Sequence, residues 1–130
     1  MAECQGLPQF TEEREMAGGK LTTHVLDTSA GKPGAGLRID LYRLTGDERT
    51  ALKTVQTNDD GRCDEPLLTG EDFGPGEYEL VFHVGDYFKT ASSPAFLDKV
   101  PVRFGVSSAG QHYHVPLLIS PFGYSTYRGS

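Results

Sequence analysis

The chain has no tryptophan, only two cysteines, no run of lysine or arginine, and no long apolar stretch among its 130 residues. A nucleic-acid-binding protein concentrates positive charge on one surface, whereas the basic residues here are scattered and the net charge is −6. A membrane-spanning helix needs about 20 consecutive apolar residues, and no stretch approaches that length. The sequence therefore predicts neither nucleic acid nor a membrane as a partner.

The two cysteines do not form a disulfide framework. Cys4 lies in a polar stretch, residues 1–19, and Cys63 lies in the middle of the chain. Two reduced thiols are typical of a cytoplasmic protein. The first residues lack the basic start and apolar core of a secretory signal, and the last three are not the Ser-Lys-Leu address of peroxisomes. We expect a cytoplasmic location, with the peroxisome as the alternative in a eukaryote.

Glycine and proline are abundant, with 16 and 8 residues, which favours many turns over long helices. Between the turns, residues 37–44 alternate apolar and polar side chains, as a half-buried strand does. Asp60-Gly61 marks a tight turn, because glycine readily adopts positive φ. Similar patterns predict strands at 21–28, 51–57, 78–84, 99–106, 112–120 and 123–130, and a short helix at 85–92. This pattern predicts an all-β antiparallel sandwich over residues 20–130, preceded by a polar arm.

Polar groups recur on one face of the predicted terminal strands. Alternation in residues 112–120 places His112 and His114 opposite the apolar core positions, and alternation in residues 21–28 places His24 on the corresponding face. Leucine, proline and tyrosine share these faces, which is unusual for a surface in water. The pattern predicts a face that a partner covers.

Three chemistries compete as explanations for these histidines. His-x-His with a third histidine can bind zinc and leave one position open for water. A Ser-His-Asp hydrolase would need a Gly-x-Ser-x-Gly elbow between strand and helix, which this chain lacks. The third is metal-free hydrolysis, in which paired imidazoles activate a water and an arginine holds an anionic substrate.

A single histidine on a strand is most often a surface or hydrogen-bonded residue. His83, on the same face as Glu79, is assigned such a structural role. For His112, the alternative to a ligand is that it orients a neighbouring side chain.

Four motifs stand in a recognisable order: LTTHVLDTSAGKP at 21–33, DDGR at 59–62, HYHVPLL at 112–118 and GYSTYRGS at 123–130. Together they resemble the 5-hydroxyisourate hydrolase family, the transthyretin-related enzymes of urate breakdown. The terminal Tyr-Arg-Gly-Ser is the most specific of the four. The resemblance covers about residues 20–130 and leaves out only the polar arm.

The resemblance implies a transthyretin-like sandwich of two four-stranded sheets with one short helix, assembled as a homotetramer built from two dimers. The active sites of the family lie in the channel between the dimers, and the polar face described above would line it. Matching the motifs position by position implies catalytic roles for His24, Arg62, His114 and Ser130, and substrate binding by His24, Arg62 and Tyr127.

The implied reaction is the hydrolytic opening of the six-membered ring of 5-hydroxyisourate to 2-oxo-4-hydroxy-4-carboxy-5-ureidoimidazoline, without metal or cofactor. His24 and His114 would position and deprotonate the attacking water and return a proton to the ring nitrogen. Arg62 would stabilise the negative charge that develops on the substrate oxygen. Tyr127 and Ser130 would bind substrate and shape the pocket.

Two binding proteins are the rivals of an enzyme. Transthyretin carries a small hydrophobic hormone in the same fold, so the fold does not decide the function. A carrier needs apolar walls, whereas this chain would place two histidines, an arginine and a tyrosine in the channel. A carbohydrate-binding sandwich normally shows exposed aromatic platforms, and this chain has no tryptophan.

Overall fold

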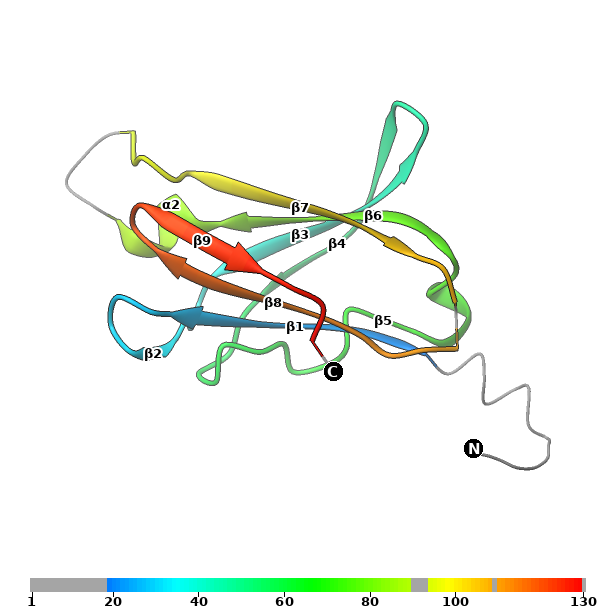
Figure 1. Ribbon diagram of the computed structural model, residues 1–130, viewed down its shortest axis with the longest axis horizontal. Helices are drawn as coiled ribbons and strands as arrows, with labels where there is room; N and C mark the ends of the chain where they lie inside the picture. The colour runs from blue at the N-terminus through cyan, green and yellow to red at the C-terminus, as the bar shows by residue number, and fades with distance from the viewer. Residues whose placement is uncertain (1–18, 90–93, 109, 130) are drawn as a thin grey trace.

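The computed structural model describes residues 19–89, 94–108 and 110–129, which fold into two β-sheets packed face to face (Figure 1). The elements run in the order β1 (Lys20–Asp27), β2 (Lys32–Pro33), β3 (Arg38–Thr45), β4 (Glu48–Gln56), β5 (Leu68–Thr69), a 3₁₀ turn η1 (Gly70–Asp72), β6 (Gly76–His83), α2 (Val84–Phe88), β7 (Lys99–Val106), β8 (Tyr113–Ser120) and β9 (Gly123–Thr126). The predicted polar arm, apart from Gly19, lies outside the described residues. No helix in the described ranges has the length and apolar character needed to cross a membrane.

Sheet A has the strand order β2-β1-β8-β9, and β5 also pairs with β1. The two-residue strands β2 and β5 occupy opposite ends of one edge of β1, next to Asp27 and Lys20 respectively. Sheet A therefore contains five strands where four were predicted, because the short strands β2 and β5 pair with different parts of the same edge of β1. The β1–β8 pair is parallel, a departure from the antiparallel pattern that local alternation does not reveal.

Sheet B has the order β4-β3-β6-β7, with all neighbours antiparallel. Its number of strands agrees with the prediction, and β7 covers the predicted residues 99–106. The predicted helix is shorter than expected: α2 ends at Phe88, and Lys89 follows in the left-handed conformation with φ of 47°. Residues 90–92 of that prediction lie outside the described residues.

The core confirms the predicted alternation in the strands. Leu21 and Val25 of β1, with Leu117 and Ile119 of β8, have no exposed surface. Burying a large apolar side chain contributes about 1.5–3 kcal/mol, so these positions fix which face of each strand points inward. The intervening residues of β1 and β8 consequently point away from the core, on the outer face of sheet A.

The outer face of sheet B also carries charged groups, and these groups are paired. His83 Nε2 lies 2.9 Å from Asp40 Oδ2, and both residues are buried. The buried carboxylate of Glu79 accepts hydrogen bonds of 2.8 Å from Arg49 and from Arg103. These contacts agree with the structural role assigned to His83.

Candidate active site

A tight turn after β4 places Arg62 against sheet A. The side-chain oxygen of Asn58 accepts hydrogen bonds from the backbone N–H groups of Asp60 and Arg62, at 2.9 and 3.1 Å. Gly61 has φ of 77°, as the Asp-Gly pair predicts. A Cβ at Gly61 would lie 2.3 Å from the carbonyl oxygen of Val25. Only glycine therefore lets this turn approach β1 so closely.

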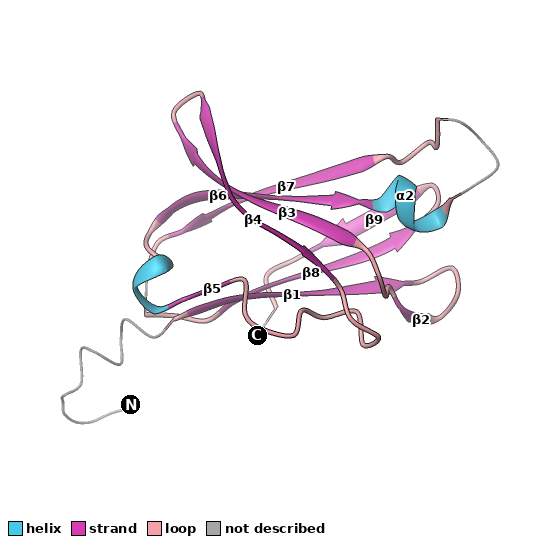
Figure 2. Ribbon diagram, turned by 180° about the vertical axis from the view of Figure 1, so that it is seen from behind, coloured by secondary structure: helices cyan, strands magenta, loops and turns pink. Residues whose placement is uncertain are grey.

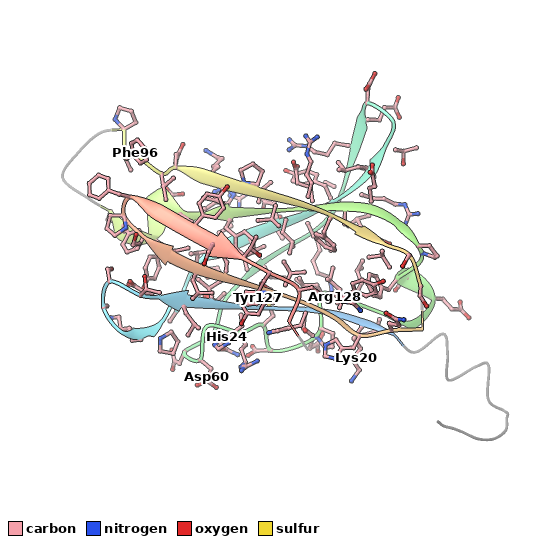
Figure 3. All side chains as sticks on the ribbon, in the orientation of Figure 1. Lys20, His24, Asp60, Phe96, Tyr127 and Arg128 are labelled. Carbon is pink, nitrogen blue, oxygen red and sulfur yellow. The ribbon has the colours of Figure 1, made fainter. Side chains whose placement is uncertain are left out.

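The turn joins the free edge of β1 between β2 and β5 (Figure 2). The N–H of Val25 donates to the Gly61 carbonyl at 2.8 Å, and an isolated antiparallel bridge sets Arg62 opposite His24. His24 Nε2 lies 3.1 Å from the carbonyl oxygen of Asp60 (Figure 3). Because a carbonyl can only accept, Nε2 carries the proton in this contact, and Nδ1 of the neutral ring keeps its lone pair.

The parallel pairing of β1 with β8 places Thr22 beside His114. The hydroxyl oxygen of Thr22 lies 2.8 Å from His114 Nδ1 and 2.9 Å from His112 Nε2. With Nδ1 engaged by Thr22, Nε2 is the nitrogen of His114 left for a substrate or water. His24 and His114 are both half-buried, whereas His112 is exposed.

The C-terminal segment keeps its register beyond the end of β9. Thr126 pairs with Leu117, and an isolated bridge in the same register joins Gly129 to His114. The N–H of Gly129 donates to the His114 carbonyl at 2.7 Å. A Cβ at Gly129 would lie 2.7 Å from Cδ2 of the His114 ring. Gly129 thus packs directly against the edge of this imidazole.

The same register sets Tyr127 opposite Pro116, and residues directly opposite in an antiparallel pair share a face. Tyr127 therefore belongs to the outer face of sheet A, with 60% of its surface exposed. It also borders a hollow of about 320 Å³ beside Val102, Phe104 and Tyr113.

Arg128 holds the terminal segment in place. Its guanidinium lies 4.0 Å from the centre of the Tyr113 ring and donates a 2.9 Å hydrogen bond to Gln111. These contacts tie the last described residues to the segment that leads into β8. Ser130, predicted as a catalytic residue, lies outside the described residues.

Arg62 influences both half-buried histidines. Burial lowers the pKa of His24 below its ordinary value of 6.5, and the positive charge of Arg62 lowers it further. Burial also lowers the pKa of His114, with added contributions from the charges of Arg62, His112 and His24. Both rings are therefore neutral at neutral pH, which leaves a lone pair on each that can accept a proton.

The structure brings three of the predicted residues, His24, Arg62 and His114, to one face, with Tyr127 on that face by register. Among the described residues, no three side chains of His, Cys, Asp or Glu gather where they could hold a metal ion. The role of Thr22 was not predicted. Its place beside His24 on the alternating face was visible in the sequence, but its contact with His114 depends on the pairing of β1 with β8.

Comparison with known proteins identifies a family and individual relatives that this chain resembles. The profile of the "HIUase/Transthyretin family" matches residues 21–129. A Rhizobium meliloti protein named 5-hydroxyisourate hydrolase 2 is 63% identical over 116 residues, which span 86% of this chain and 97% of the relative. The solved structures of two further proteins also match.

The structure of Klebsiella pneumoniae 5-hydroxyisourate hydrolase is 34% identical, with a TM-score of 0.68, and the match covers 86% of this chain and all of the other. Sea bream transthyretin in complex with thyroxine is 28% identical, with a TM-score of 0.76, and the match covers 85% of this chain and 94% of the other. These matches confirm the predicted transthyretin-like fold. The higher TM-score to a hormone-binding protein shows that backbone similarity does not separate enzyme from carrier.

Proposed function

Because the chain belongs to the HIUase/transthyretin family, we propose that it hydrolyses 5-hydroxyisourate to 2-oxo-4-hydroxy-4-carboxy-5-ureidoimidazoline in urate breakdown. The predicted hydrolase class agrees with the names of the Rhizobium and Klebsiella relatives, both 5-hydroxyisourate hydrolases. One observation supports the assignment to the site: His24 and His114 share one sheet face with Arg62, and burial together with the charge of Arg62 lowers the pKa of both histidines.

The two histidines supply the proton transfers. Nδ1 of His24 and Nε2 of His114 are the nitrogens left free by the contacts with Asp60 and Thr22. In the proposed reaction, one of these nitrogens accepts a proton from water while the water oxygen bonds to C6 of the substrate. The N1–C6 bond then breaks, and the protonated imidazole returns its proton to N1. The two histidines act as a pair in these proton transfers.

Arg62 stabilises the charge that forms in this step. As water adds to C6, negative charge develops on the carbonyl oxygen, and a nearby cation lowers the energy of that state. Together with burial, the same charge lowers the pKa of both imidazoles and favours their neutral form between turnovers. Tyr127 closes the side of the site formed by the C-terminal segment, and we propose that Ser130 contributes a hydrogen bond there.

A small-molecule carrier is the second candidate, and the similarity to sea bream transthyretin supports it. The outer face of sheet A argues against it, because a hydrophobic ligand would have to displace water from an arginine and two histidines. Removing water from such groups without replacing their hydrogen bonds is costly.

Apolar side chains beside the histidines support the proposed assembly. The register of β1 and β8 sets His24 next to Pro116 and Leu26 next to Leu118 on the outer face of sheet A. We propose that two dimers join over this face as a homotetramer, with the sites in the channel between them. We also propose that the protein acts in the cytoplasm.

The test of this function is the decay of freshly prepared 5-hydroxyisourate, followed in the near ultraviolet with and without the protein. We expect the protein to accelerate the decay strongly, and exhaustive chelation to leave the rate unchanged. Tight binding of thyroxine without acceleration would favour the carrier. Loss of activity on chelation, restored by zinc, would show that the metal-free mechanism is wrong.

A further inference from the structure

Thr22 places one hydroxyl group between two imidazole rings. Its oxygen lies 2.8 Å from His114 Nδ1 and 2.9 Å from His112 Nε2, and the two rings meet edge to face with centres 6.4 Å apart. Both distances are those of hydrogen bonds. A hydroxyl group has one proton to donate, so it cannot donate to both nitrogens at once.

Two neutral arrangements use the single Thr22 proton in one of these hydrogen bonds and a ring N–H in the other. In the first, His112 Nε2 donates to Thr22 and Thr22 donates to His114 Nδ1, so the proton of His114 lies on Nε2. In the second, His114 Nδ1 donates to Thr22 and Thr22 donates to His112 Nε2, so Nε2 of His114 is unprotonated. Only the second arrangement lets His114 accept a proton from water.

We propose that Thr22 and His112 are positioning residues for His114. The Thr22 hydroxyl couples the ring proton of His114 to that of His112, and Nε2 of His114 is thereby presented as the base. This inference rests on the proposed hydrolase function. Thr22 and His112 act through His114 and do not themselves contact the reacting atoms.

The coupling also limits the charge on the pair. When His114 takes a proton on Nε2, both its nitrogens are donors, and Thr22 must accept from Nδ1. The hydroxyl proton of Thr22 is then free to donate to an unprotonated His112 Nε2. A second proton, on His112, would leave Thr22 accepting from both rings and would put two positive charges on rings whose centres are 6.4 Å apart. The positive charge of Arg62, and that of His24 when it is protonated, also oppose this second charge.

Contacts on the opposite edge of the His114 ring keep it in place while the protons rearrange. Gly129 lies against Cδ2 and binds the His114 backbone carbonyl at 2.7 Å. With Thr22 at Nδ1 and Gly129 at Cδ2, the ring is held from two sides. Nε2 therefore keeps one direction in both arrangements.

Replacing the hydroxyl tests the proposal. We expect Thr22→Val, which keeps the shape and removes the hydrogen bonds, to lower kcat about 10- to 100-fold with little change in KM, the range seen when the hydrogen-bonded partner of a metal-bound histidine is removed. Thr22→Ser should restore most of the activity. The matched control is Thr28→Val, because Thr28, directly after β1, also donates to a β8 residue, at 3.0 Å to the Ile119 carbonyl. It should leave kcat unchanged.

The ring protons can be observed directly by ¹⁵N NMR of histidine side chains in the substrate-free protein. We expect His114 to carry its proton on Nδ1 in the wild type and in Thr22→Ser, and to shift towards a mixture in Thr22→Val. Because no substrate is needed, this readout tests the positioning even if the protein fails to hydrolyse 5-hydroxyisourate. A wild-type kcat together with unchanged His114 signals in Thr22→Val would overturn the proposal. Should that variant not fold, Thr22→Ala serves for the same comparison.

Discussion

The outer faces of the two sheets carry similar side chains in opposite electrostatic states. On sheet B, His83 lies 2.9 Å from the carboxylate of Asp40. On sheet A, His114 contacts a neutral hydroxyl, and the positive charge of Arg62 lowers its pKa in addition to burial. The first histidine lies beside an anion, and the second lies near a cation.

The carboxylates of sheet B are stabilised as anions. Burial alone would raise the pKa of Asp40, but hydrogen bonds from His83, Arg38 and Thr54 outweigh it and hold the pKa below its ordinary value. Burial would likewise raise the pKa of Glu79, and hydrogen bonds from Arg103 and Arg49 reverse that effect. Asp40 and Glu79 are thus each paired with neighbouring side chains, and these contacts join the strands of the sheet to one another.

Sheet A shows what a reactive surface needs in addition to polar residues. Burial and the positive charge of Arg62 both lower the pKa of His24 and His114, so each neutral imidazole keeps a lone pair. The difference between the sheets therefore lies in pairing rather than in residue type. Variants on the two sheets can therefore separate the reactive face from the structural one.

Deleting residues 127–130 should abolish hydrolysis while the sandwich still folds. The deletion removes Tyr127 and the Gly129 backbone contact with His114, whereas the buried core lies in earlier strands. Circular dichroism reports the fold and substrate decay reports the activity. A tag at the C-terminus should impair activity more than a tag at the N-terminus. Normal turnover by the folded, truncated protein would show that the terminal segment plays no part in the site.

Replacing His24 with alanine should lower the rate about 10²–10⁴-fold, the usual contribution of a positioned acid or base. The melting temperature should change little, because His24 points away from the core. His112→Ala is the control and should cost less activity, because His112 acts through Thr22. Equal losses in both variants would contradict the different roles given to these two histidines.

Introducing a charge at Leu118 should split the proposed tetramer into dimers and lower activity with it. Leu118 lies on the same face of β8 as His114, and an unpaired charge in an interface is costly to desolvate. Analytical ultracentrifugation of Leu118→Asp reports the assembly. Leu52→Asp is the control, since Leu52 is 40% exposed on β4 in sheet B. A wild-type protein that is fully active as a monomer would contradict the proposed assembly.

The pH dependence of the rate should reflect the lowered pKa values of His24 and His114. Neutral imidazoles are the active form, and a lowered pKa means that they become protonated only at lower pH. The rate should therefore fall with acid only below pH 6.5, the ordinary value for histidine. Arg62→Gln should move this limb towards 6.5, because the cation that opposes protonation is gone. A fall in the wild-type rate that begins above pH 6.5 would contradict the lowered pKa values of the two histidines.

Local pattern was sufficient to predict the parts of the fold that depend on neighbours in the chain. The alternation of residues 99–106 predicted β7, and Asp60-Gly61 predicted a turn with positive φ. The parallel pairing of β1 with β8 was not predictable in this way, because strand order depends on contacts between distant segments.

The site was predictable only in part for the same reason. Alternation placed His24 and His114 on outer faces, but the family resemblance was needed to add Arg62, which reaches His24 through the close approach of Gly61 to β1. Thr22 was missed because a threonine in a strand has no distinctive pattern. Its importance depends on the register that sets it beside His114.

The most direct test of the contrast between the two sheets compares His114→Ala with His83→Ala, measuring the rate of 5-hydroxyisourate decay and the free energy of unfolding for each. We predict that His114→Ala loses about 10²–10⁴-fold in rate and keeps its stability. We predict that His83→Ala keeps its rate and loses about 1–3 kcal/mol, because Asp40 loses a buried hydrogen-bond partner. Full activity in His114→Ala, or a comparable loss of rate in His83→Ala with the fold intact, would contradict the account.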